Sequence, residues 1–133
     1  MFLITDKLKL TEKVTKMSIL APFICLHAKP GQFVMIRIHE MGERIPLTIA
    51  DVNHDKQTID IIYQVIGATT YLLDQLRSGD YLLDCAGPLG KPSVLEGLKK
   101  VLLIGGGVGC AILYPIAKAL RVMNAEIDTI VGF

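Results

Sequence analysis

The 133-residue chain is 51% apolar and 20% charged, a composition that allows a packed core and argues against disorder. Its 14 basic and 13 acidic residues leave a net charge of +1, and no basic stripe indicates a nucleic-acid-binding surface. The N-terminal residues do not resemble a signal peptide, and no apolar run approaches the roughly 20 residues that cross a bilayer. We therefore expect a cytoplasmic protein that binds neither nucleic acid nor membrane.

The first hundred residues have the pattern of short β-strands separated by turn signals. Predicted strands cover residues 2–10, 14–20, 33–38, 45–50, 58–66 and 81–86. Apolar residues at Leu72, Leu73 and Leu76 indicate one short helix over residues 69–77. Residues 87–90, Gly-Pro-Leu-Gly, have a turn composition and are predicted to link this part to the next. Strands of this length and spacing favour a closed antiparallel barrel or a sandwich.

The pattern changes near Gly97. Residues 101–104 form an unbroken apolar run, typical of a strand buried on both faces of a parallel sheet. A glycine-rich segment, a helical pattern over 111–123 and a second buried strand over 127–131 follow, which together predict a βαβ unit. We place the boundary between a β unit, residues 1–97, and an α/β unit, residues 98–133.

The predicted α/β unit has two strands that are apolar on both sides, but only one helix to cover them. One face of the sheet should therefore be uncovered, and a large exposed apolar surface usually marks a contact or an aggregation site. We expect this region to self-associate, to dock on a partner, or to be mobile while the barrel stays folded.

Three cysteines, Cys25, Cys85 and Cys110, are widely spaced, form no Cys-x-x-Cys pair and lie among apolar residues. We interpret them as small buried hydrophobic residues in a reducing compartment. The three histidines are equally scattered, so no spacing typical of metal ligands is present and no metal site is predicted.

The glycine-rich segment at residues 105–109 lies between a predicted strand and a predicted helix. Glycines let the backbone approach a diphosphate closely, and the N-terminus of the following helix attracts the anion. The spacing departs from a strict dinucleotide-binding fingerprint, because Cys110 stands where the third glycine would be. A tight turn without a ligand is the alternative interpretation.

Two further segments carry groups suited to a phosphorylated, ring-bearing ligand. In residues 44–48, Arg-Ile-Pro-Leu-Thr, an arginine can pair with phosphate and Pro-Leu offers an apolar ledge for a flat ring. In residues 62–70, a strand with Tyr63 leads into a Gly/Thr turn that begins the short helix, again a site for an anion. The alternatives are an ordinary strand capped by a polar residue and an aromatic residue of the barrel wall.

Four segments together resemble a known family: RIPLTIAD (44–51), IYQVIGATT (62–70), GDYLLDCAGPLG (79–90) and GGGVGCAILYPIAKAL (105–120). The chain is identified by them as a member of the ferredoxin–NADP reductase superfamily. Within it, the chain is most similar to the electron-transfer subunits of dihydroorotate dehydrogenase and of NADH-dependent ferredoxin:NADP oxidoreductase, also called sulfide dehydrogenase beta subunit. The resemblance implies an antiparallel Greek-key FAD-binding barrel followed by a parallel α/β nucleotide-binding domain, here incomplete.

The resemblance also implies site residues. FAD would be held by Arg44, Pro46, Leu47, Thr48, Ile62, Tyr63, Gln64, Gly67, Thr69 and Thr70. Among these, Thr48 would lie near the reactive edge of the flavin, and Arg44 would anchor an anionic group. The NAD(P)H diphosphate would be held by Gly105, Gly106, Gly107, Val108 and Gly109. No residue of the chain is implied to be catalytic, since the flavin carries the chemistry.

The chain departs from the family pattern at three positions. Ile45 separates Arg44 from the proline, Gln64 stands where an arginine is frequent, and Ile112 stands where a proline usually follows the glycines. The family also continues with more βα units and a cysteine-rich stretch that binds a [2Fe–2S] cluster, so we expect a truncated chain without this cluster.

Two hypotheses follow from the resemblance. The chain is an oxidoreductase subunit that passes electrons from NAD(P)H through FAD to a ferredoxin or a larger flavin and iron–sulfur subunit. Alternatively, it is a flavin-binding or structural module without nicotinamide turnover, in which case NAD(P)H reduces the flavin weakly or not at all.

Overall fold

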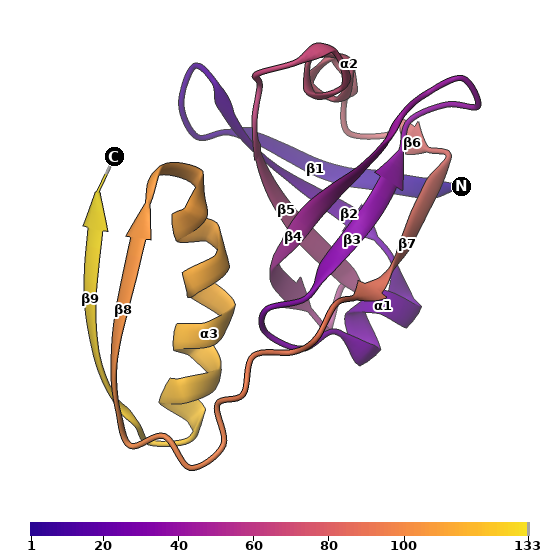
Figure 1. Ribbon diagram of the computed structural model, residues 1–133. Helices are drawn as coiled ribbons and strands as arrows, with labels where there is room; N and C mark the ends of the chain where they lie inside the picture. Colours follow the sequence, from indigo (N-terminus) through magenta and orange to yellow (C-terminus); the bar gives the residue numbers. More distant parts are fainter. Residues whose placement is uncertain (133) are drawn as a thin grey trace.

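The computed structural model describes residues 1–132, and most of this region is one antiparallel sheet (Figure 1). Its strands are β1 (Phe2–Lys9), β2 (Val14–Leu20), β3 (Phe33–Arg37), β4 (Arg44–Asn53), β5 (Thr58–Gln64), β6 (Tyr81–Leu82) and β7 (Asp84–Leu89). They pair in the order β6-β1-β2-β5-β4-β3-β7. Because β2 pairs with β5 rather than with β3, the hairpin-connected strands β3, β4 and β5 form a Greek key with β2.

The sheet closes on itself through the segment that was predicted as the single strand 81–86. In the structure, β6 pairs with β1 while β7, one residue later, pairs with β3, so the same stretch of chain covers both edges of the sheet. The prediction of a turn at residues 87–90 was wrong, because Gly87–Leu89 belong to β7 and Leu89 pairs with Phe33. The result is a nearly closed barrel, which confirms the predicted antiparallel fold.

Two short helices lie near opposite ends of the barrel (Figure 1). Helix α2 (Ala68–Gln75) is the predicted one, and its Leu73 is fully buried. Helix α1 (Pro22–His27) was not predicted, because six residues are too few to show a helical period. It begins with proline, which suits the first helical position, and places Ile24 and Cys25 in the core.

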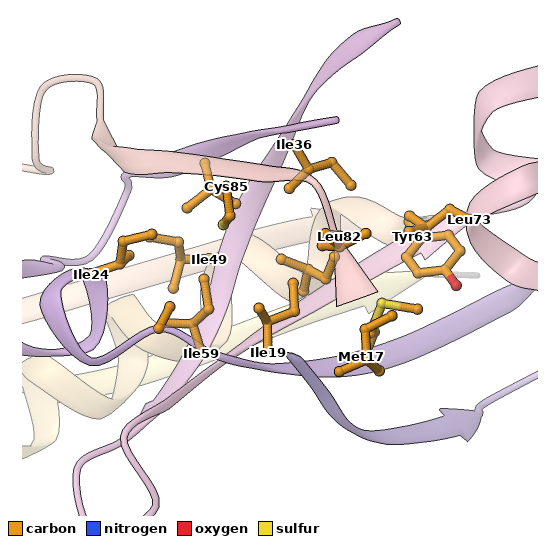
Figure 2. Packing of buried hydrophobic residues seen from close by; sticks show 14 of the residues in the cluster. Met17, Ile19, Ile24, Ile36, Ile49, Ile59, Tyr63, Leu73, Leu82 and Cys85 are labelled. Carbon is orange, nitrogen blue, oxygen red and sulfur yellow. The ribbon is translucent and has the colours of Figure 1, made fainter. Parts of the chain in front are cut away.

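The barrel interior is a continuous apolar core (Figure 2). Alternation along the strands builds it: in β5, Ile59, Ile61 and Tyr63 point inward and are at most 2% exposed. The other fully or nearly buried members are Ile4, Met17, Ile19, Ala21, Ile24, Cys25, Val34, Ile36, Ile49, Leu73, Leu82 and Cys85. Two of the cysteines are thus buried as expected, and burial raises the pKa of the Cys85 thiol to about 12. Cys110 is only partly buried.

A βαβ unit follows the barrel, as predicted. It consists of β8 (Lys100–Gly106), the short 3₁₀ turn η1 (Gly107–Gly109), α3 (Cys110–Val122) and β9 (Glu126–Gly132), with β8 and β9 parallel. Helix α3 lies between this sheet and the barrel, where it contacts β4 (Figure 1). The opposite face of the sheet is uncovered, as expected: Leu102, Ile104 and Ile130 are 54%, 66% and 57% exposed.

Within residues 1–132, none of the three helices is long and apolar enough to cross a membrane.

Candidate functional site

A cleft of about 310 Å³ lies between the barrel and the start of α3. The barrel contributes residues of β4 and β5 and the first turn of α2, and the other wall comes from η1 and α3. The cleft is lined by Pro46, Leu47, Thr48, Ile62, Tyr63, Gln64, Ile66, Thr70, Val108, Gly109, Ala111 and Ile112. Three segments that the sequence singled out separately are therefore brought together in one place.

Strand alternation decides which side chains can reach a ligand in this cleft. Successive side chains of a strand point to opposite faces, so Pro46 and Thr48 share one face of β4. Leu47 lies between them, and its side chain packs against the barrel core. In β5, Ile62 and Gln64 point away from the core in the same way. The cleft wall is therefore mostly apolar, with Thr48 and Gln64 as its polar side chains on these strands.

Tyr63 is among the residues that line the cleft, but its side chain is turned away from it. Its side chain is 2% exposed and points into the barrel, where its hydroxyl donates a hydrogen bond to Asp74 Oδ1 at 3.2 Å. Burial and the nearby Asp74 carboxylate raise the pKa of Tyr63, so the phenol is neutral. The Tyr63 side chain thus belongs to the barrel core, and the contact of this residue with FAD stays a prediction.

The start of α2 presents backbone groups rather than a capping side chain. Gly67 precedes the helix and has no side chain to cap its first N–H groups, and a Cβ built on Gly67 would meet no atom within 4 Å. The Thr70 hydroxyl accepts hydrogen bonds from the N–H groups of Ile66 and Gly67, both at 3.0 Å, and donates to the Gly67 carbonyl. Thr70 therefore fixes the turn with its side chain, and the first N–H groups of the helix have no partner within the helix.

The start of α3 repeats this arrangement. Gly109 precedes the helix without a side-chain cap, Gly107 adopts a φ of +55°, and a Cβ on either glycine would meet nothing within 4 Å. Gly105 has another role: a Cβ there would lie 2.6 Å from Leu113 Cδ1, so this glycine lets α3 pack on β8. Gly105 and Gly106 also extend β8 and pair with Val131 and Gly132, so the expected loop begins two residues later than predicted.

Arg44 does not line the cleft. Its guanidinium lies 3.3 Å from Asp84 Oδ2, and the same carboxylate receives Arg37 at 2.7 Å. The Arg44 side chain is 52% exposed and stands on the same strand as Pro46, two residues away and on the same face. Because Arg37 can satisfy Asp84, Arg44 is free to turn toward an anion without leaving that carboxylate unpaired.

Two adjoining hollows extend the cleft with residues that the sequence did not indicate as part of a site. One, about 330 Å³, reaches Leu10, Thr11, Val14 and Cys110, and the other, about 540 Å³, reaches Lys13 and Tyr71. Residues 10–14 arrive there because β2 pairs with β5 with Val14 opposite Gln64. This register depends on long-range pairing, and no local sequence signal indicates it.

No lysine or arginine is among the residues that line the main cleft. Lys13 belongs to the adjoining hollow, where Gly67 and Ala68 also lie. An anion in the cleft would therefore be attracted mainly by the N-termini of α2 and α3, because backbone N–H groups and helix dipoles favour negative charge there.

The comparisons with known proteins agree with this geometry. No protein-family model matches the chain. The chain is 48% identical over 129 residues to an electron transfer subunit homolog of dihydroorotate dehydrogenase B (NAD(+)) from Thermotoga maritima, covering 97% of this chain and 46% of that protein. It is 40% identical over 108 residues to the electron transfer subunit of dihydroorotate dehydrogenase B from Streptococcus mutans, covering 77% and 42%. The chain thus spans about half the length of the curated relatives it matches.

Among solved structures, an NADH-dependent reduced ferredoxin-NADP oxidoreductase superposes with a TM-score of 0.95 at 48% identity, over 98% of this chain and 47% of that chain. A nearly closed antiparallel barrel joined to a parallel βαβ unit, with a cleft between them, is the ferredoxin reductase-like fold. The chain belongs to the ferredoxin–NADP reductase superfamily. Within it, the chain is a homologue of the electron-transfer subunits of dihydroorotate dehydrogenase B.

Proposed function

We propose that this chain binds FAD in the cleft between the barrel and α3, as part of an oxidoreductase subunit that passes electrons between NAD(P)H and an iron–sulfur partner. One observation carries the proposal. Two helices that begin after an uncapped glycine, α2 after Gly67 and α3 after Gly109, have their first turns at the same cleft and its adjoining hollow. Such helix starts suit the phosphates of a dinucleotide, and the apolar wall beside them suits a flat ring.

The residues have distinct proposed roles. Pro46, Thr48 and Ile62 form the surface for the ring system, and the Thr48 hydroxyl can donate to or accept from its polar edge. The N–H groups at the start of α2 hold the diphosphate, with Arg44 turning from Asp84 to add a charged contact. The flavin, when bound, supplies the redox chemistry, and the chain contributes placement, exclusion of water and electrostatics.

The second nucleotide and the partner are also proposals. The open sides of Gly106 and Gly107 leave room for a diphosphate, and we assign this position to NAD(P)H. The relatives named as electron transfer subunits support the existence of a partner subunit. We propose that this partner is a larger flavin and iron–sulfur subunit or a ferredoxin.

The change in flavin fluorescence on binding tests the site directly. The sharpest variant is Gly67→Val: the φ of −149° suits valine and no atom lies within 4 Å, so the fold should be kept. The added methyl groups would occupy the place proposed for the diphosphate. We expect FAD affinity to fall about tenfold or more, as for the loss of a charged hydrogen bond, while riboflavin, which lacks phosphate, binds unchanged. Equal FAD affinity in Gly67→Val and the wild type would show that the diphosphate does not bind at the start of α2.

Arg44→Ala tests the proposed charged contact. It should raise the FAD dissociation constant about tenfold, since hydrogen bonds to charged groups contribute roughly 1.5–3 kcal/mol. Arg121→Ala, on the exposed last turn of α3, is the matched control and should leave the constant unchanged. An unchanged constant in Arg44→Ala would place this residue outside the site.

Anaerobic titration with NADH and NADPH separates the two functional hypotheses for the 133-residue chain. We expect bound FAD to be bleached slowly or not at all at about millimolar nucleotide, the upper end of ordinary KM values. Fast, saturable bleaching would support nicotinamide turnover by this chain. A stable oxidised flavin would support a flavin-binding module.

A further inference from the structure

Glu43, just before β4, places its carboxylate at the start of α2. The Thr69 hydroxyl donates a hydrogen bond to Glu43 Oε2 at 2.6 Å, across 26 positions in the sequence. Thr69 is the second residue of the helix, and α2 has no acidic residue in its own first turn and no side-chain cap. Glu43 is therefore an acidic group supplied by another segment to the positive end of this helix.

The charge of Glu43 has no basic partner nearby. Within residues 1–132, none of the ion pairs involves Glu43, whereas Arg44, its neighbour in sequence, is paired with Asp84. Among the described residues, the Glu43 carboxylate is thus held by the Thr69 hydroxyl at the start of α2 rather than by a basic side chain. A second anion at the same helix start would meet an uncompensated like charge and would compete for the same donors.

We propose that Glu43 is an internal competitor of the flavin diphosphate: its carboxylate occupies the start of α2 when no flavin is bound and lowers the affinity of the site for FAD. This inference rests on the proposed FAD site. It also gives the Thr69 hydroxyl a definite role, since that hydroxyl must leave Glu43 before it can donate to a phosphate. The loop that carries Glu43, between β3 and β4, would then move as FAD binds.

The test compares Glu43→Gln with the wild-type chain. Glutamine can still accept the Thr69 hydrogen bond through its amide oxygen, so the loop is kept while the charge is removed. We expect FAD to bind about two- to fivefold more tightly in Glu43→Gln, the size of one charge at a helix terminus. Riboflavin affinity should not change. The matched control is Glu40→Gln, an exposed glutamate of the same loop, which should leave both affinities unchanged.

Inorganic pyrophosphate distinguishes failure of this inference from failure of the FAD proposal. Its binding can be followed by the NMR shifts of the Ala68, Thr69 and Thr70 amides, and it should bind more tightly in Glu43→Gln. A tighter pyrophosphate response without FAD binding would support the role of Glu43 and overturn the FAD site. FAD binding with equal or weaker affinity in Glu43→Gln would overturn the competitor role and leave the FAD site standing. Absence of any response to either probe in both proteins would overturn both.

Discussion

The barrel and the α/β unit both contain apolar strands, but the two regions differ in how far the strand side chains are buried. In the barrel, closure through β6 and β7 pairs both sheet edges and encloses a core in which Ile4, Ile36 and Ile61 are fully buried. In the α/β unit, residues 100–132, only Leu103 and Leu120 are buried, although both strands are as apolar as those of the barrel. An antiparallel sheet can cover itself by closing, whereas a parallel pair of strands depends on helices on both faces.

The largest difference in the free energy of unfolding is expected between matched isoleucine-to-alanine substitutions in the two regions. Ile61 is fully buried in the barrel, and Ile104 is 66% exposed on the uncovered face of β8. Ile61→Ala should lower the free energy of unfolding by about 2–5 kcal/mol, because it leaves a cavity in a closed core. Ile104→Ala should change it by less than about 0.5 kcal/mol. Urea unfolding followed by far-UV circular dichroism measures both, and a large cost at Ile104 would show that its face is covered in solution.

Asp74 is a polar residue of α2 that is bonded to the barrel strands, and its substitution should have the next largest effect on the free energy of unfolding. It accepts hydrogen bonds from Thr15 Oγ1 at 2.8 Å, from Lys9 Nζ at 2.6 Å and from the Tyr63 hydroxyl, and so ties α2 to three strands. Burial tends to raise the pKa of Asp74, but the hydrogen bonds from Lys9 and Thr15 and the charges of Lys7 and Lys9 outweigh it and lower the pKa. Asp74→Asn should cost about 1.5–3 kcal/mol at neutral pH.

The lowered pKa of Asp74 also fixes the direction of the pH dependence. Because the unfolded state binds the proton more tightly, this contribution is complete above the unfolded pKa of about 4 and is lost as the pH falls through the lower folded value. In Asp74→Asn, the decline of stability in acid should be shallower than in the wild type. Asp55→Asn, at an exposed turn, is the control and should leave both the stability and its pH dependence unchanged.

Local sequence patterns predict some features of the fold and the candidate site, but not others. Buried strands and α2 follow from local periodicity, and the glycines, Arg44 to Thr48 and Gly67 to Thr70 follow from recognisable chemistry. Local patterns do not determine which face of β5 turns inward, so they do not indicate that the Tyr63 side chain is buried. They also do not determine that Val14 lies opposite Gln64, which brings residues 10–14 to the cleft, or that residues 81–89 change partner to close the barrel. These features depend on long-range register.

Two adjacent glycines probe the packing of the α/β unit. A Cβ on Gly105 would lie 2.6 Å from Leu113 Cδ1 and 3.3 Å from Cys110 Cα, whereas a Cβ on Gly106 would meet nothing within 4 Å. Gly105→Ala should therefore destabilise this unit by about 1–3 kcal/mol, as overpacking does. Gly106→Ala should have little effect. Hydrogen exchange of the Val101–Leu103 amides measures the change, and protection in the barrel should be unaffected. Equal effects of the two substitutions would show that α3 is not packed closely on β8.

The smallest effect is expected where the two regions meet. Lys118 of α3 lies 2.6 Å from Asp51 Oδ1 of β4, but the Lys118 side chain is 50% exposed. The hydrogen bond to Asp51 raises the pKa of Lys118 despite partial burial. The contribution of this ion pair to stability is therefore present at neutral pH and is lost only as the pH rises above the ordinary lysine range.

Exposed ion pairs contribute about 0.2–1 kcal/mol. A double-mutant cycle with Asp51→Asn and Lys118→Met, which keeps the apolar stem, should give a coupling in that range that weakens at high salt. Lys99→Met, at an exposed position before β8, should show no coupling with Asp51→Asn. A salt-independent coupling above about 2 kcal/mol would mean that this ion pair, rather than the apolar contact of α3 with β4, joins the two regions.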